Sequence, residues 1–273
     1  MKIYIMTDLE GVAGVLDFDN WCTPESRYYD AAKELLTLEV NAAVQGFVAG
    51  GADEIVVADG HGHGAIDPAI IHPRAMLMRG WPVGFPLGLD SSFNAIAWVG
   101  QHAKSGAEFA HLAHTQSFSM LDYSINEVSV GEFGQMALCA LELGVRPILG
   151  AGDLAFTKEA EALFPEIKTV AVKYGTTPGI GEECTAEEYR GRNGAAVHFS
   201  PEKAREMLTE AAMRAVSNAR DVGPAFLDMQ PPYEIVSKWR ADASKPARSD
   251  TISRMSSISE AVNVSLGIKP PKP

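Results

Sequence analysis

The stretch Lys2-Ile3-Tyr4-Ile5-Met6-Thr7-Asp8-Leu9-Glu10-Gly11 decides the fold of this 273-residue chain. Its first six residues predict a buried β-strand, which Asp8 and Glu10 follow. Side chains alternate faces along a strand, so we expect both carboxylates to point the same way. Two adjacent carboxylates repel each other, and a metal ion or another bound cation is the simplest partner that would stabilise them.

The residues that follow predict a β-α-β unit. Residues 27–47 carry Ala, Leu and Val at helical spacing, and Gly50-Gly51 ends that segment. A second apolar strand is expected at 54–58. Parallel strands joined by a right-handed crossover follow from this order, so the expected fold class is α/β, with a mostly parallel sheet flanked by helices.

The predicted alternation of strands and helices continues to about residue 175, and a different organisation is expected after it. We expect residues 1–175 to form the α/β domain with the metal-binding and catalytic residues, 176–268 a smaller C-terminal α+β lobe packed on it, and 269–273 a disordered tail. Further strands are predicted at 75–78, 94–99, 123–128, 147–149, 168–172 and 233–237, and helices at 130–143, 157–163, 200–219 and 256–266.

Composition narrows the class of protein. Apolar residues make up 46% of the chain, which allows a sizeable core, and the net charge of −12 disfavours a nucleic acid or an anionic membrane as partner. Cys22, Cys139 and Cys184 have no metal-like spacing, which favours a reducing compartment. No signal peptide or membrane-spanning apolar run is visible, so a cytoplasmic location is expected.

Metal-capable side chains follow three of the predicted strands, and one more begins a predicted helix. Residues at the carboxyl ends of parallel strands converge at one edge of a sheet. Imidazole and carboxylate suit one or two zinc ions, or manganese. Two metals need a bridging carboxylate, and the shorter reach of Asp8 makes it our choice for the central position. The candidates are Asp8 and Glu10, Asp59 and His61, His102, and Glu132.

Other histidines could take part in the chemistry. His63 follows His61 by two residues, so in an extended chain both side chains would lie on the same side, and the role of His63 is left open. His111 and His114 lie in the loop 107–119, where a histidine near the metals could move a proton or orient a carbonyl. We favour a solvated loop position for His111, and also for His198.

Several enzyme classes are excluded because their motifs are absent. The chain contains no G-x-x-x-x-G-K-S/T, G-x-S-x-G or H-E-x-x-H. Asp8-Leu9-Glu10-Gly11 is weakly similar to the nucleophile loop of haloacid-dehalogenase-like phosphatases. Glu10 and Val12 stand where those enzymes use a second aspartate and a threonine, which argues against that class.

As a set, the motifs resemble those of the D-aminopeptidase DppA family of zinc metallopeptidases. The similarity is ordered across roughly residues 1–215 and looser to 268. Gly60 replaces a serine of the family, His63 adds an imidazole, and His114 comes one residue later than usual. The matching segments are Thr7-Asp8-Leu9-Glu10-Gly11, Asp59-Gly60-His61, Gly100-Gln101-His102-Ala103, Ala113-His114-Thr115 and Val130-Gly131-Glu132.

The resemblance implies a dinuclear zinc site, with two ions per subunit and manganese as an alternative. It implies release of N-terminal, D-configured residues from short peptides, by a ring-shaped homo-oligomer such as a decamer. Another dinuclear metal hydrolase, either an amidase or a phosphoesterase, stays open, as does a non-catalytic peptide-binding component of a transport system. The implied ligands are Asp8, Glu10, His61, His102 and Glu132, and the implied catalytic residue is His114.

Overall fold

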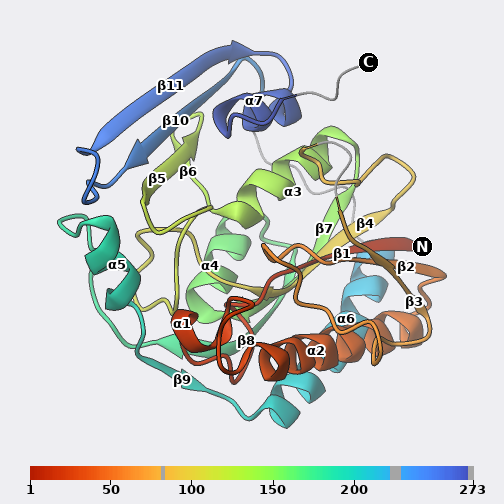
Figure 1. Cartoon of the computed structure of the whole chain (residues 1–273). Coiled ribbons are helices and arrows are strands. Elements are labelled where there is room, and N and C mark those ends of the chain that lie inside the picture. Colours follow the sequence, from red (N-terminus) through yellow and green to blue (C-terminus); the bar gives the residue numbers. More distant parts are fainter. Residues whose placement is uncertain (81–83, 222–228, 270–273) are drawn as a thin grey trace.

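The computed structural model describes residues 1–80, 84–221 and 229–269. The predicted tail at 269–273 therefore lies outside the described residues, apart from Lys269. A large sheet forms the middle of the molecule, with helices on both sides and a smaller sheet beside them (Figure 1). None of the described helices is long and apolar enough to cross a membrane.

The large sheet confirms the predicted fold class. Its strand order is β3-β2-β1-β4-β7-β8-β9, and all neighbours are parallel except β8 and β9. The strands are β1 (Lys2–Thr7), β2 (Glu54–Ala58), β3 (Ala75–Met78), β4 (Ala95–Gln101), β7 (Arg146–Asp153), β8 (Lys168–Gly175) and β9 (Ala196–His198).

Alternation along β1 sends side chains into two separate cores. Ile3 and Ile5 pack in the core under α2 (Tyr29–Ala49) and α6 (Pro201–Asp221). Tyr4 and Met6 pack in the other core, with α3 (Glu132–Glu142), α4 (Leu154–Leu163) and α7 (Ile258–Ser265). Two short helices, α1 (Phe18–Trp21) and α5 (Ala186–Arg192), complete the described helices.

The smaller sheet is antiparallel and takes its strands from distant parts of the chain. Its order is β11-β10-β5-β6, formed by β5 (Met120–Ile125), β6 (Val128–Ser129), β10 (Tyr233–Trp239) and β11 (Arg248–Met255). The sequence did not predict β11, because its side chains are mostly exposed and polar on both faces. The domain division at residue 175 stays a prediction, and this sheet joins strands from both sides of it.

The strand order reverses at β1 and β4. After β3 the chain returns to the other side of β1, which makes the carboxyl ends of β1 and β4 a topological switch point, where α/β proteins bind ligands. The two strand ends approach closely: Asp8 N donates to Val99 O over 3.0 Å, and Gly11 N donates to Gly100 O over 2.7 Å. A Cβ atom on Gly100, whose φ is +79°, would lie only 2.0 Å from Asp8 O.

We expect Gly100→Ala to cost more than about 3 kcal/mol of unfolding free energy, because it adds a backbone clash to an unfavourable φ. Gly144→Ala is the matched control: its φ is +74°, but nothing lies within 4 Å of the added Cβ. That variant should cost only about 1–2 kcal/mol. Urea unfolding of both variants measures the difference, and equal costs would contradict the close approach of β1 and β4.

Candidate metal centre

Two carboxylates converge on one imidazole beyond the ends of β1 and β2. His61 Nδ1 lies 3.2 Å from Asp8 Oδ1 and 3.2 Å from Glu10 Oε2. The strand β1 ends at Thr7, so the predicted reason for their convergence, alternation along a strand, is wrong. The turn after β1 brings both carboxylates to His61 instead. The other nitrogen of the ring, Nε2, lies 2.8 Å from the carbonyl oxygen of Cys22.

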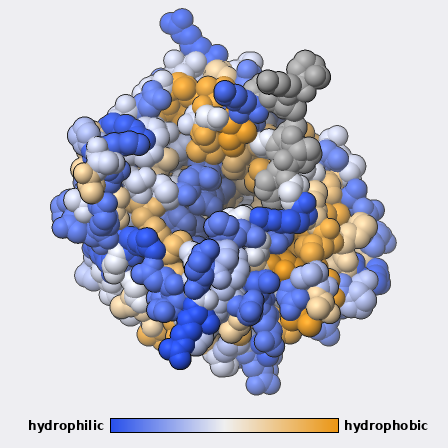
Figure 2. All heavy atoms as spheres, viewed as in Figure 1, coloured by the Kyte–Doolittle hydropathy of each residue, from blue (hydrophilic) through white to orange (hydrophobic). Residues whose placement is uncertain are grey.

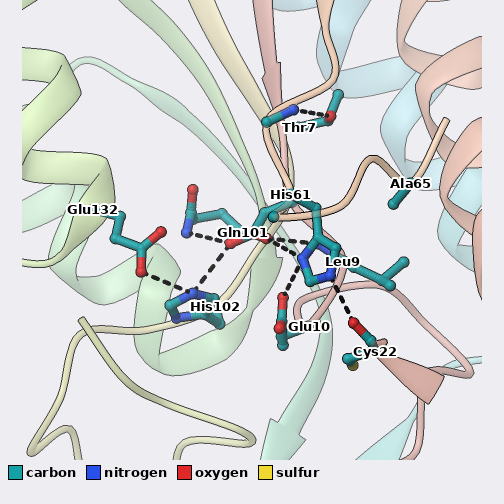
Figure 3. Close-up of polar contacts among 12 residues, drawn as sticks. Thr7, Leu9, Glu10, Cys22, His61, Ala65, Gln101, His102 and Glu132 are labelled. Carbon is teal, nitrogen blue, oxygen red and sulfur yellow. Dashed lines mark hydrogen bonds and ion pairs between the residues drawn. The ribbon is translucent and has the colours of Figure 1, made fainter. Parts of the chain in front are cut away.

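A second group forms beside the first, beyond β4. His102 Nε2 lies 3.1 Å from Asp8 Oδ2 and 3.6 Å from Glu132 Oε1, and His114 Nε2 lies 3.9 Å from the same Glu132 oxygen. In Figure 3 the side chains of Glu132, His102, Glu10 and His61 point toward one another from different elements. Within the described part of the chain there are two sets of three donors, and the donors of each set lie within 4.8 Å of one another: Asp8, Glu10 and His61, and His102, His114 and Glu132.

Asp8 lies between the two sets. Its Oδ1 faces His61 and its Oδ2 faces His102. The same carboxylate accepts hydrogen bonds from Leu9 N at 2.9 Å and from Gln101 Nε2 at 3.1 Å. This placement supports the predicted central position of Asp8. Sequence reasoning gave Gln101 no role, although it lies inside a quoted motif, because the direction of its side chain depends on how β4 ends.

Opposite charges compensate each other within the cluster. Burial alone would raise the pKa of Asp8, but His102 and His61 lower it well below its usual value. Burial alone would lower the pKa of His61, yet the Glu10 and Asp8 carboxylates raise it to about 12. The pKa of His102 is likewise raised against burial, by Asp8 and Glu132. These carboxylates therefore attract positive charge to the cluster.

The donor set fits divalent metal ions. Glu10 is 2% exposed, and its Oε2 has no hydrogen-bond partner of good geometry, even though His61 Nδ1 lies 3.2 Å away. A buried carboxylate oxygen without a hydrogen bond is costly unless a cation compensates it. Imidazole nitrogens and carboxylate oxygens are ligands that zinc and manganese accept.

His114 presents one ring nitrogen to the cluster. Its Nδ1 lies 2.8 Å from the carbonyl oxygen of Leu112, so Nδ1 carries the proton and Nε2 offers its lone pair toward Glu132. The ring stacks on His102 with centroids 3.9 Å apart. Burial, followed by the charge of His102, lowers the pKa of His114. His114 comes one residue later than in the family motif, and it still lies beside the cluster.

Three other candidates lie outside the cluster. Asp59 Oδ1 accepts a hydrogen bond from Ala65 N at 2.7 Å, so this carboxylate fixes a turn. His63 is exposed at the edge of the cavity. The solvated position predicted for His111 is wrong: the side chain is fully buried, and its Nε2 donates to Leu16 O over 3.0 Å.

Ionisable side chains from several elements bind the backbone of residues 10–16, the segment that begins with Glu10. Sequence reasoning missed Lys173 and Glu39, because β8 and α2 are remote from this segment along the chain. The contacts join Lys173 Nζ to Glu10 O and Val15 O, Glu39 Oε1 to Ala13 N, His198 Nδ1 to Gly14 N, and His111 Nε2 to Leu16 O.

Two sets of metal-capable donors around a central carboxylate, at the switch point of a parallel sheet, are typical of metal-dependent hydrolases. A family model described as D-aminopeptidase, peptidase M55, matches residues 1–266. The chain belongs to this family, which confirms the resemblance inferred from the sequence motifs.

Individual relatives agree with this assignment. The D-aminopeptidase of Bacillus subtilis (strain 168) is 30% identical over 227 residues, which cover 82% of this chain and 77% of the relative. A solved structure, the Zn-dependent D-aminopeptidase DppA from Bacillus subtilis, described as a self-compartmentalizing protease, superposes with a TM-score of 0.82. That match has 26% identity and covers 98% of this chain and 96% of the other.

We expect acid to destabilise the fold through the histidines beside residues 10–16. Burial, followed by the charge of Lys173, lowers the pKa of His198 to about 4. Burial, followed by the charges of Lys173 and His198, lowers the pKa of His111 to about 2. The ordinary histidine pKa is about 6.5, so the unfolded chain binds more protons below that value. The stabilisation is complete above about pH 6.5 and is lost progressively as pH falls toward 4 and below.

His198→Asn tests this dependence, because an amide oxygen can accept the Gly14 hydrogen bond but does not titrate. Urea midpoints at pH 7.5 and 4.5 should fall less in the variant than in the unchanged protein. The cluster residues are the same in both proteins, so the difference isolates His198. An identical fall in both would contradict the assignment.

We expect Lys173→Met to weaken binding of divalent metal by about 10- to 100-fold, the usual effect of removing a group that orients a ligand. The ammonium group of the fully buried Lys173 is lost, and the Glu10 carbonyl loses its donor. Lys168→Met, a change on the same strand at a half-buried position, is the control. Competition with a chromogenic chelator measures affinity, and unchanged affinity in Lys173→Met would contradict this role.

Proposed function

We propose that this protein is a dinuclear zinc aminopeptidase that hydrolyses the N-terminal residue, of D configuration, from short peptides. The observation that carries the proposal is the position of the Asp8 carboxylate. One of its oxygens faces His61 of the first donor set, and the other faces His102 of the second. Manganese would suit the same donors. The proposed ligands are Asp8, Glu10, His61, His102 and Glu132, and the proposed catalytic residue is His114.

When bound, a pair of such ions supplies an activated water and polarises the peptide carbonyl. Asp8 would bridge the two sites, and Gln101 holds its carboxylate in position through a 3.1 Å hydrogen bond. His114 has a lone pair on Nε2 that faces the cluster, so it can accept a proton there and transfer it to the leaving amine.

We further propose that the chain assembles into a ring-shaped homo-oligomer, a decamer by resemblance to the DppA family, and that it acts in the cytoplasm. The description of the Bacillus subtilis structure as a self-compartmentalizing protease supports the assembly. Enclosed active sites would restrict access to short peptides.

Metal content and turnover measured on the same preparations test the proposal. Chelator-stripped protein reloaded with zinc should bind two ions per chain and release the first residue of D-alanyl peptides. Asp8→Asn should lose both metals and activity, because it removes the shared ligand. His114→Ala should keep the metals and lose about 100- to 10,000-fold in kcat. His72→Ala, at a half-buried position outside the cavity, is the control.

Two results would contradict this function. Hydrolysis of phosphate esters by protein that leaves every peptide intact would indicate a phosphoesterase. Tight binding of peptides by fully metal-loaded protein, with no turnover, would indicate a peptide-binding component.

A further inference from the structure

A cavity of about 430 Å³ opens beside the metal-capable cluster. In the space-filling view the molecule is hollowed near the centre of the face that it presents (Figure 2). One side of the cavity, the acidic wall, is formed by Asp8, Glu10, His61, His114 and Glu132. That wall carries the proposed chemistry, but it covers only part of the lining.

Another part of the cavity lining is apolar. We call the side chains of Met6, Phe85, Trp98 and Met136 the apolar floor; each is 8% exposed or less. They belong to β1, β4, α3 and the segment before Leu89, so the floor is built where four parts of the chain meet. The half-buried side chains of Leu87 and Ile268 extend the apolar lining above it.

The apolar floor is fixed before any ligand binds. Asn263 of α7 accepts a hydrogen bond from Phe85 N at 2.9 Å and donates one to Phe85 O at 2.8 Å. Tyr4 donates its hydroxyl proton to Leu87 O at 2.6 Å. The ring of Trp98 packs edge-on against Phe133 at 4.5 Å between centroids. A preformed apolar surface of this kind binds a ligand without the cost of ordering its own side chains.

The rim of the cavity is less buried than the apolar floor. The remaining lining residues include Thr23, His63 and Gln116, which are half-buried or exposed and mostly polar. A peptide enters an aminopeptidase by its amino end, so its first residue goes deepest and the rest of the chain leaves through the rim. With the scissile carbonyl at the acidic wall, the first side chain is the part of the substrate that can reach the apolar floor.

We propose that the apolar floor receives the side chain of the substrate's N-terminal residue and selects apolar side chains larger than the methyl group of alanine. This inference rests on the proposed aminopeptidase function. No lysine or arginine is among the described residues that line the cavity, so an acidic side chain finds no charged partner there. A charged first residue would have to lose its hydration against Trp98 and Met136, which is costly.

Two matched dipeptide series test the proposal, each made in D and L forms. In the first, X-Gly, the N-terminal residue is Ala, Leu, Phe, Asp or Lys; in the second, Ala-X, the same residues occupy the second position. With zinc-loaded protein we expect kcat/KM for Leu-Gly or Phe-Gly to exceed that for Ala-Gly by about tenfold or more. Asp-Gly and Lys-Gly should fall below Ala-Gly.

Variants of the floor connect the preference to named residues. Phe85→Ala and Leu87→Ala should each lower the ratio of Leu-Gly to Ala-Gly turnover by at least about fivefold, because they remove apolar surface from the subsite. Leu87 is only half-buried, so Leu87→Ala keeps the test open if Phe85→Ala does not fold. Met76→Ala, at a 50% exposed position of β3, should leave the ratio unchanged.

Two outcomes would overturn the inference. One is equal turnover of all X-Gly peptides, and the other is a preference that follows the second residue in the Ala-X series. Both require an active peptidase, so they leave the proposed function intact. Failure of zinc-loaded protein to cleave any dipeptide of either series would instead contradict the proposed function itself.

Discussion

The position of one carboxylate, that of Asp8, depends on how closely the ends of β1 and β4 approach each other. Gly11 and Gly100 allow backbone contact there, since a Cβ atom at either position would lie within 2.4 Å of backbone atoms across the gap. The approach puts Asp8 between the imidazoles of His61 and His102. A wider gap between the strands would separate the Asp8 carboxylate from one of these two imidazoles.

Burial makes this arrangement sensitive to its surroundings. Charged groups removed from water are costly unless they are paired, so the backbone that carries them must be held accurately. Lys173 and Glu39 bind the segment after β1, whereas Glu159 accepts hydrogen bonds from Lys104 N at 3.1 Å and Gly131 N at 2.7 Å. The loops next to Glu10, His102 and Glu132 are thus fixed by ionisable side chains that themselves lie outside the cluster.

The smaller sheet and α7 also help to shape the site. Through Asn263, α7 holds Phe85 at the cavity, and Tyr123 of β5 shares a 2.6 Å hydrogen bond with Ser265 at the end of α7. The C-terminal part of the chain therefore shapes the apolar floor, while the proposed metal ligands all come from the first half. The apolar floor itself is interleaved with those ligands: Met6 of β1 precedes Asp8, and Met136 lies in α3, which begins at Glu132.

The sequence by itself determined the β-α-β start, the parallel sheet and the set of metal-capable residues, because strand periodicity and strand ends are local features. It placed Asp8 and Glu10 together through strand alternation, although a turn after Thr7 is what brings them to His61. Only the tertiary structure decided the roles of Gln101, Lys173 and His111, and the position of the apolar floor. Each of these depends on contacts between residues far apart in the chain, and no local pattern of side chains records which distant backbone atoms they will meet.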